Sequence, residues 1–197
     1  EKQFLQNNIK LAISGLSGYL ASFANGIHVL KANFYLAQSY FSDGKESEAA
    51  VNYEFVISKP RNEFTEQSLA RLSEIYLKKD DYAKAIPVLQ RLETEADFPQ
   101  NVMYAQANLM RSLYEQKDYS NSVVYADKVL ANPKTDIKIK SDAQIIVARA
   151  AIQVKDESKA KVAYAKLLTI AKGELAAEAL YYEAYFKSKE AKYEDSN

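Results

Sequence analysis

Cysteine is absent from the 197 residues, and histidine occurs once, at His28. Without thiols the chain has neither a disulfide framework nor a thiolate nucleophile, although this absence does not distinguish cytosol from periplasm. Glycine (5) and proline (4) are also scarce, in a chain rich in Ala, Leu, Lys, Glu and Gln. Because the residues that break helices are few and far apart, the composition predicts helix throughout.

The chain also lacks net charge, since Lys and Arg total 26 and Asp and Glu total 26. No long-range field would attract nucleic acid or an anionic membrane, so we expect neither partner. The stretch from Leu11 to Leu30 has no charge and is long enough to span a bilayer. Its serines and the turn-forming sequence Ala24-Asn25-Gly26 interrupt it, so we expect no membrane span in this segment.

A pair of helical motifs recurs four times along the chain. The first motif is a large apolar residue, then usually a small one, and a third residue three positions later. It occurs as Leu36-Ala37-x-x-Tyr40, Leu72-Ser73-x-x-Tyr76, Leu109-Met110-x-x-Leu113 and Val147-Ala148-x-x-Ala151. The second motif places a small residue four positions before a residue that is usually large. It occurs as Ala49 with Tyr53, Ala85 with Leu89, Ser122 with Ala126 and Ala160 with Tyr164.

The spacing within each pair is constant, whereas the spacing between pairs varies. From the last residue of the first motif to the small residue of the second, as from Tyr40 to Ala49, the separation is always 9. A longer turn would rotate the apolar stripe of the second helix away from the first, so its length is constrained. From one pair to the next the separation is 36, 37 and then 38, which predicts surface connections that tolerate insertion.

The turns and the small residues after them have predicted roles. Each turn carries an Asp that we expect to cap the incoming helix and to complement its positive end. These are Asp43, Asp80-Asp81, Asp118 and Asp156. The small residues, such as Ala49, are expected where two helices cross closely.

This pattern resembles the tetratricopeptide repeat (TPR), whose first helix carries Leu-small-x-x-Tyr and whose second carries Ala-x-x-x-aromatic before a Pro. The resemblance implies an all-α fold, a right-handed superhelical solenoid of antiparallel helix hairpins, over 1–197. Both ends look like parts of hairpins, so we expect a single solenoid segment of a longer protein. The expected units are a partial hairpin at 1–27, repeats at about 30–61, 66–96, 103–134 and 141–173, and a partial hairpin at 177–197.

A narrower resemblance rests on Phe23-Ala24-Asn25-Gly26 before Ala32-x-x-Tyr35-Leu36-Ala37-x-x-Tyr40. This stretch is similar to the repeats of bacterial cell-envelope proteins, among them Tol-Pal-associated TPR proteins and outer-membrane assembly lipoproteins. The resemblance implies a periplasmic or outer-membrane-associated location, and a cytoplasmic one stays open.

Groups that could carry catalysis are few, so we expect no enzyme, no catalytic residue, no cofactor and no metal site. His28 follows a turn and is interpreted as a surface or capping residue, because no partner ligands stand at usable spacing. Gly15-x-x-Gly18 lies inside a predicted helix and most simply permits close helix contact. Carboxylate pairs such as Asp80-Asp81 suit capping better than acid–base chemistry, which requires burial.

Binding is the function that the repeat favours, because the first helices of such hairpins line a concave surface suited to a peptide. Helical geometry predicts that the partner-binding positions on this face are Lys31, Phe34, Gln38, Phe41, Gln67, Glu74, Tyr104, Arg111, Tyr114, Arg149, Tyr181 and Tyr185. Aromatic residues and Arg are common at interaction hot spots, but the rings could equally pack between helices. The leading hypothesis is therefore a non-catalytic scaffold that binds a protein or peptide in a cell-envelope complex.

Two alternatives remain open at this point: a spacer within a longer TPR protein, and a ligand-capturing envelope lipoprotein. The Lys and Asn pattern of TPR domains that clamp a C-terminal carboxylate is not reproduced, which argues against a receptor for chaperone tails. The partner and the oligomeric state do not follow from the sequence.

Overall fold

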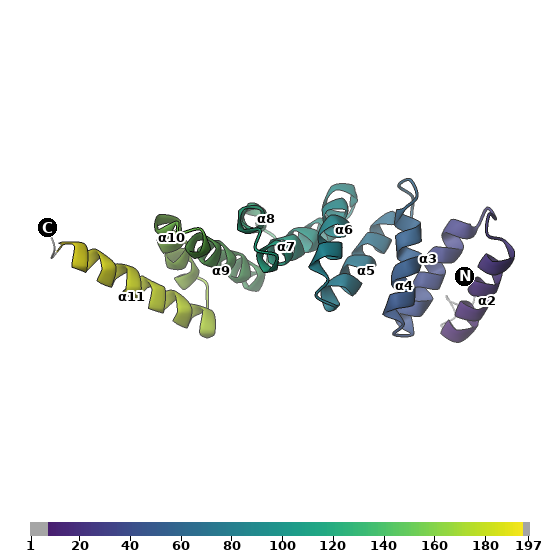
Figure 1. Cartoon of the computed structure of the whole chain (residues 1–197), viewed down its shortest axis with the longest axis horizontal. Coiled ribbons are helices and arrows are strands. Elements are labelled where there is room, and N and C mark those ends of the chain that lie inside the picture. The colour runs from purple at the N-terminus through teal and green to yellow at the C-terminus, as the bar shows by residue number, and fades with distance from the viewer. Residues whose placement is uncertain (1–7, 195–197) are drawn as a thin grey trace. The chain divides into compact units, whose positions relative to one another are not determined.

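The computed structural model describes residues 8–194, and every regular element in that range is an α-helix (Figure 1). The expected all-α class is confirmed. The helices are α2 (Ile9–Ser22), α3 (Val29–Ser42), α4 (Glu46–Ile57), α5 (Thr65–Lys78), α6 (Tyr82–Glu95), α7 (Pro99–Glu115), α8 (Tyr119–Ala131), α9 (Ile137–Gln153), α10 (Glu157–Leu168) and α11 (Glu174–Glu194). The partial hairpins predicted at 1–27 and 177–197 lie partly outside the described residues. Their described parts are in α2 and α11.

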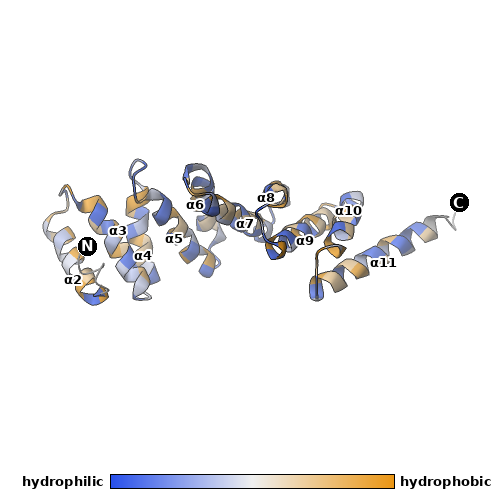
Figure 2. Cartoon of the chain, turned by 180° about the vertical axis from the view of Figure 1, so that it is seen from behind, coloured by the Kyte–Doolittle hydropathy of each residue, from blue (hydrophilic) through white to orange (hydrophobic). Residues whose placement is uncertain are grey.

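The chain divides into two compact units, residues 1–101 and 102–197. In unit 1, α2 packs on α3, α3 on α4, α4 on α5 and α5 on α6. In unit 2, α8 packs on α9, α9 on α10 and α10 on α11. Packing of each helix on its neighbour in sequence is the arrangement of a hairpin stack. The ribbons of α9, α10 and α11 carry both hydrophobic and hydrophilic residues along their length (Figure 2).

The repeated motif residues form the seams of the hairpins. Tyr53 and Tyr164, from the second motif, are almost completely buried, and so are the small residues Ala49, Ala85 and Ala160. Ser122 occupies the same position in α8, where its hydroxyl donates to the Met110 carbonyl at 2.8 Å. The small residues therefore lie at close helix crossings, as predicted, and the one polar member has a hydrogen-bond partner.

All four hairpin turns share one backbone structure, illustrated by the first. Gly44 has a φ of 75°, and the N–H of Lys45 donates back to the Tyr40 carbonyl at 2.8 Å. The Lys45 carbonyl then accepts from the N–H of Ala49, at 3.0 Å. The two hydrogen bonds connect the two motifs and account for their constant separation. The corresponding left-handed residues of the other turns are Asp80, Lys117 and Lys155, with φ of 53°, 63° and 60°.

Three of the predicted Asp caps are confirmed, and the fourth is wrong. Asp81, Asp118 and Asp156 occupy the N-cap positions of α6, α8 and α10, where each side chain accepts a backbone N–H. In the first turn the N-cap of α4 is Lys45, and no side chain caps it. Asp43 pairs with the Lys45 ammonium at 2.7 Å, and this hydrogen bond lowers the pKa of the Asp43 carboxyl.

The uncharged stretch from Leu11 to Leu30 is divided, because α2 ends at Ser22 and α3 begins at Val29. Gly26 lies in the turn between them, where an added Cβ would approach the Tyr19 hydroxyl to 2.6 Å. Among the described helices, none is both long and apolar enough to cross a bilayer.

Candidate functional site

In unit 1 the predicted binding positions differ in depth. Phe34 is 6% exposed and stacks on Phe64, with the ring centroids 4.4 Å apart. Gln38 is 8% exposed, and its amide nitrogen has no hydrogen-bond partner among the described residues. We therefore remove Phe34 and Gln38 from the predicted partner-binding surface, because the packing of α3 against its neighbours covers both.

The remaining positions of unit 1 reach the surface. Phe41 is half-buried and carries the Arg71 guanidinium over its ring, 4.9 Å from the centroid. Arg71 in turn pairs with the exposed Glu74 at 2.8 Å. Sequence reasoning missed Arg71, although an opposite charge three residues before Glu74 was a visible signal. Gln67 is exposed and Lys31 half-buried, and the binding role of all these positions stays a prediction.

In unit 2 the two predicted arginines connect successive first helices. Arg111 of α7 pairs with Asp142 of α9, Nη2 to Oδ2, at 2.7 Å. Arg149 of α9 pairs with Glu178 of α11 through two hydrogen bonds, Nε to Oε1 at 2.9 Å and Nη2 to Oε2 at 2.5 Å. Both arginines stand two residues before the last residue of the first-helix motif. The same position of the repeat therefore forms an ion pair with the next first helix in two successive repeats.

Glu178 is the most strongly connected carboxylate of this surface. The Arg149 guanidinium holds the pKa of Glu178 below its ordinary value, partial burial opposes this, and a hydrogen bond from the Tyr164 hydroxyl at 3.0 Å reinforces it. Burial and the same hydrogen bond raise the pKa of Tyr164, which therefore stays protonated. The ion pair is thus tied to the core through Tyr164, whose ring stacks on Tyr182 at 4.3 Å.

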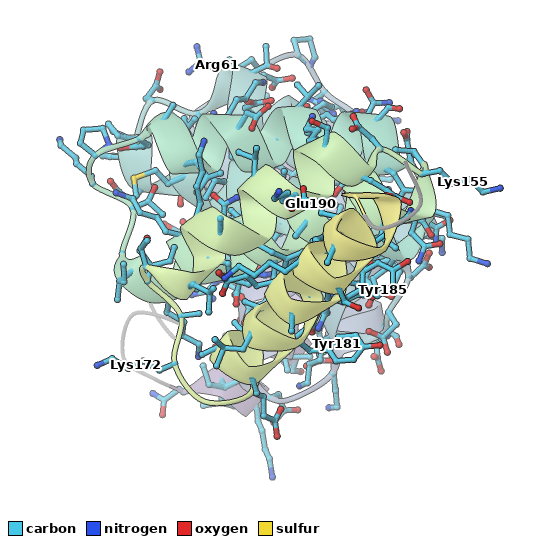
Figure 3. All side chains as sticks on the ribbon, turned by 90° about the vertical axis from the view of Figure 1, so that its left-hand side faces the viewer. Arg61, Lys155, Lys172, Tyr181, Tyr185 and Glu190 are labelled. Atoms are coloured by element: carbon cyan, nitrogen blue, oxygen red, sulfur yellow. The ribbon has the colours of Figure 1, made fainter. Side chains whose placement is uncertain are left out.

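The predicted tyrosines of unit 2 fall into two groups. Tyr104 and Tyr114 of α7 are half-buried, and burial raises the pKa of Tyr114 while the nearby Arg149 opposes the increase. Tyr181 and Tyr185 are 66% and 45% exposed and follow one another along one side of α11 (Figure 3). Among these residues and the arginines, Tyr114 is partly accessible and Arg149 is exposed.

The described residues contain no cluster of three His, Asp or Glu side chains able to hold a metal ion. His28 occupies the N-cap position of α3, where it is exposed and makes no side-chain cap hydrogen bond.

Solved structures with a similar fold are TPR proteins. The structure of MamA superposes with a TM-score of 0.59 at 15% identity, covering 85% of this chain and 91% of MamA. TPR-like repeats of a putative kinesin light chain from Podospora anserina give 0.53 at 16% identity, covering 86% and 90% of the two chains. The C-terminal part of a TPR repeat-containing protein from Cytophaga hutchinsonii gives 0.55 at 20% identity, covering 85% and 62%.

No protein-family model matches the sequence, and no curated protein is similar enough to count as a relative. At these identities the similarity shows the fold alone: an αα-superhelix of the TPR class, as expected from the repeat.

Proposed function

We propose that this chain is a non-catalytic scaffold that binds a protein partner through the arginine surface of unit 2, defined as Arg111, Tyr114 and Arg149. The supporting observation is that both arginines are held in position by ion pairs yet keep 39% and 43% of their side-chain surface exposed. A positioned guanidinium loses little freedom on binding, and its five donors exceed what one carboxylate uses.

The chemistry of the surface favours an extended peptide with acidic side chains. Each guanidinium can add a partner carboxylate to the one that it already contacts, and Tyr114 of the same unit offers a partly exposed aromatic ring. Arg and Tyr are among the residues that most often dominate interface energies. The predicted positions of unit 1 that remain exposed, such as Gln67 and Glu74, are proposed as a separate and more polar contact area.

The proposed setting is a bacterial cell-envelope complex, in the periplasm or at the outer membrane. It is supported only by the resemblance of residues 23–40 to envelope TPR proteins. The alternative is a spacer segment without a ligand of its own, which would retain the fold and bind nothing.

The test compares two double variants that break the same ion pairs from opposite sides. Arg111→Gln with Arg149→Gln removes the guanidinium donors, whereas Asp142→Asn with Glu178→Gln removes the carboxylates and keeps the donors. Affinity capture from envelope and cytosolic extracts of the source organism identifies a candidate, whose affinity is then titrated with the purified partner. We expect the arginine variant to bind at least about tenfold more weakly, and the carboxylate variant, which keeps the donors but loses the charged partners that position them, to lose clearly less affinity.

Equal binding by the two variants would exclude the arginine surface. Empty captures with every protein, including the unmodified chain, would favour the spacer alternative. A partner found only in cytosolic extracts would overturn the proposed location but not the binding role.

A further inference from the structure

Lysine gathers on one helix of unit 2, although the chain as a whole has no net charge. Residues 158–173 contain Lys159, Lys161, Lys166 and Lys172, and no Asp or Glu. This segment comprises most of α10 and the connection that follows it. The expectation that the chain has no anionic membrane as a partner rests on its net charge, and a balanced total is compatible with a local excess of one sign.

One side of α10 is open to solvent, and we call it the lysine face. Its exposed residues are Ser158, Lys159, Val162, Ala165, Lys166 and Thr169. They follow one another at intervals of one, three or four residues, so they share one side of the helix. The opposite side belongs to the seam of the hairpin, where Ala160 and Tyr164 are buried.

The exposure of this face is a property of the repeat. Each of the second helices α4, α6, α8 and α10 is exposed two residues before, one before, two after and five after the small residue of its motif. In α4 these positions are exposed although α5 and α6 follow in the same unit, and they are Ser47, Glu48, Val51 and Glu54. A following hairpin therefore leaves this face open.

The charge of the face differs among the four second helices. In α4 it is acidic, with Glu48 and Glu54, and in α8 it includes Asp127. In α6 it includes Lys84, which pairs with Asp81 at 3.6 Å. On these three helices the outward charges are thus acidic or balanced by an adjacent carboxylate.

The lysine face of α10 is basic without such a balance. Lys155 and Lys172 stand before and after the helix, and both side chains extend away from the ribbons (Figure 3). Together with Lys159 and Lys166 they are four lysines that form no ion pair with any described residue.

The carboxylates nearest to this face are already engaged. The Asp156 side chain caps α10 by accepting the N–H of Lys159 at 3.0 Å. Glu157 pairs with Lys189 at 2.5 Å, and Glu190 pairs with Lys161 at the edge of the helix. The excess positive charge is therefore available to a partner.

The residue types of the lysine face suit a flat anionic surface better than a folded protein. Between the lysines stand only short side chains, such as Val162 and Ala165, so the lysine ammonium groups reach furthest out. The face has no aromatic residue and no Arg, which are the residues that dominate protein interfaces. Lysine is a point charge without the planar fork of Arg, and clusters of such charges on a helix are attracted to anionic lipid headgroups.

We propose that the lysine face of α10 binds the surface of a bilayer that contains anionic lipids, and that Lys155 and Lys172 add contacts at the two ends of the helix. The lysines approach the phosphate groups of the lipids, whereas Val162 alone is too small an apolar area to anchor the helix in the hydrocarbon. The attraction is electrostatic, so the association is reversible and weakened by salt. The proposal goes beyond the proposed function and does not involve Arg111, Tyr114 or Arg149.

The test is flotation of the 197-residue chain with vesicles of phosphatidylcholine, either pure or with about 30% phosphatidylglycerol, at about 0.1 M salt. Lys159→Gln with Lys166→Gln removes two charges from the lysine face and keeps good helix formers there. The matched control is Lys10→Gln with Lys79→Gln, which removes the same charge from exposed positions of unit 1. Circular dichroism establishes that each variant is folded.

We expect the unmodified chain to float with the anionic vesicles and not with the neutral ones. Each lysine near an anionic surface contributes a factor of about five, so the lysine-face variant should bind at least about tenfold more weakly. The control should lose clearly less. Raising the salt concentration to about 0.5 M should release the unmodified chain from the vesicles.

An unmodified chain that does not float with the anionic vesicles would overturn the proposal. Equal losses in the lysine-face variant and the control would also overturn it, because binding would then follow net charge and not this face. A chain that ignores vesicles, but loses a captured protein in the lysine-face variant, would show that the face binds an acidic protein instead.

The two proposals are distinguishable. The double variant of Arg111 and Arg149 removes the same charge as the lysine-face variant, and it should float about as well as the control. The lysine-face variant should in turn keep the partner that the arginine surface binds, so either proposal can fail while the other stands.

Discussion

The two units connect their successive first helices by different chemistry. In unit 1, Phe34 of α3 stacks on Phe64 just before α5, inside the protein, and Phe41 lies under Arg71. In unit 2 the connections are the ion pairs of Arg111 with Asp142 and of Arg149 with Glu178, at the surface. The comparison shows that the same face of the repeat can be covered by apolar packing in one unit and left as an accessible charged layer in the other.

The largest expected difference between the units comes from removing Phe34. We expect Phe34→Ala to lower the free energy of unfolding by about 3–5 kcal/mol, because it leaves a cavity beside Phe64. Chemical denaturation with a helical signal measures the loss. Phe41→Ala is the matched control, and its half-buried ring should cost clearly less. Similar losses for both would mean that the two rings do not differ in depth as described.

A smaller effect is expected from the ion pair of unit 2. Glu178→Gln should lower the free energy of unfolding by about 1.5 kcal/mol at neutral pH, because it removes the charge from the hydrogen-bonded pair with Arg149. The loss is modest because solvent already screens this partly exposed pair. The measurement is again the denaturation midpoint, and Asp142→Asn, with a single hydrogen bond to Arg111, should cost less.

The Glu178 contribution should depend on pH in a defined direction. Its pKa is lowered in the folded state, so the stabilisation is complete above the ordinary carboxyl value near 4.5 and is lost as the pH falls through the lowered pKa. The difference between the unmodified chain and Glu178→Gln should therefore shrink on acidification. The loss of stability caused by Phe34→Ala involves no titrating carboxylate, so it should not shrink in this way. A loss caused by Glu178→Gln that grew on acidification would contradict the lowered pKa of Glu178.

The smallest effect concerns the turns, where the comparison is between one hairpin of each unit. Asp156→Ala removes the side-chain cap of α10 and should cost about 1 kcal/mol. Asp43→Ala should leave the stability unchanged within error, because Asp43 does not cap α4. Thermal unfolding of the two variants side by side measures the difference, and equal losses would show that the Asp43–Lys45 pair replaces a cap.

Most of the fold could be predicted from the repeat. A recurring motif fixes both the helix period and the turn length, so the buried seam, with Tyr53 and Tyr164 in it, was accessible from spacing alone. The sequence itself could have shown that the cap predicted at Asp43 was wrong. Asp81 and Asp156 stand four residues before Ala85 and Ala160, whereas Asp43 stands six before Ala49, and a cap position allows no such shift.

The candidate site was less accessible. Helical geometry identifies the face on which Phe34 and Gln38 lie, but their burial depends on how closely the next hairpin approaches, which no local pattern encodes. The acidic partners of Arg111 and Arg149 lie 31 and 29 residues further along the chain, and they become neighbours only through the stacking of first helices. Pairs of that separation cannot be chosen from one sequence among its 26 acidic residues.

The hydrogen-bonded turn also limits the positions at which the chain can be lengthened by duplication. Because the carbonyl of Tyr40 and the N–H of Ala49 are linked through Lys45, a residue inserted into or deleted from this turn would break the hydrogen bonds that join the two helices. A duplication with both ends in connections such as 132–136 inserts a complete hairpin and leaves every turn unbroken. A cut between Leu113 and Ser122 separates two helices that depend on one another. Descendants of this chain should therefore differ in length by whole hairpins, while the short turns keep their length.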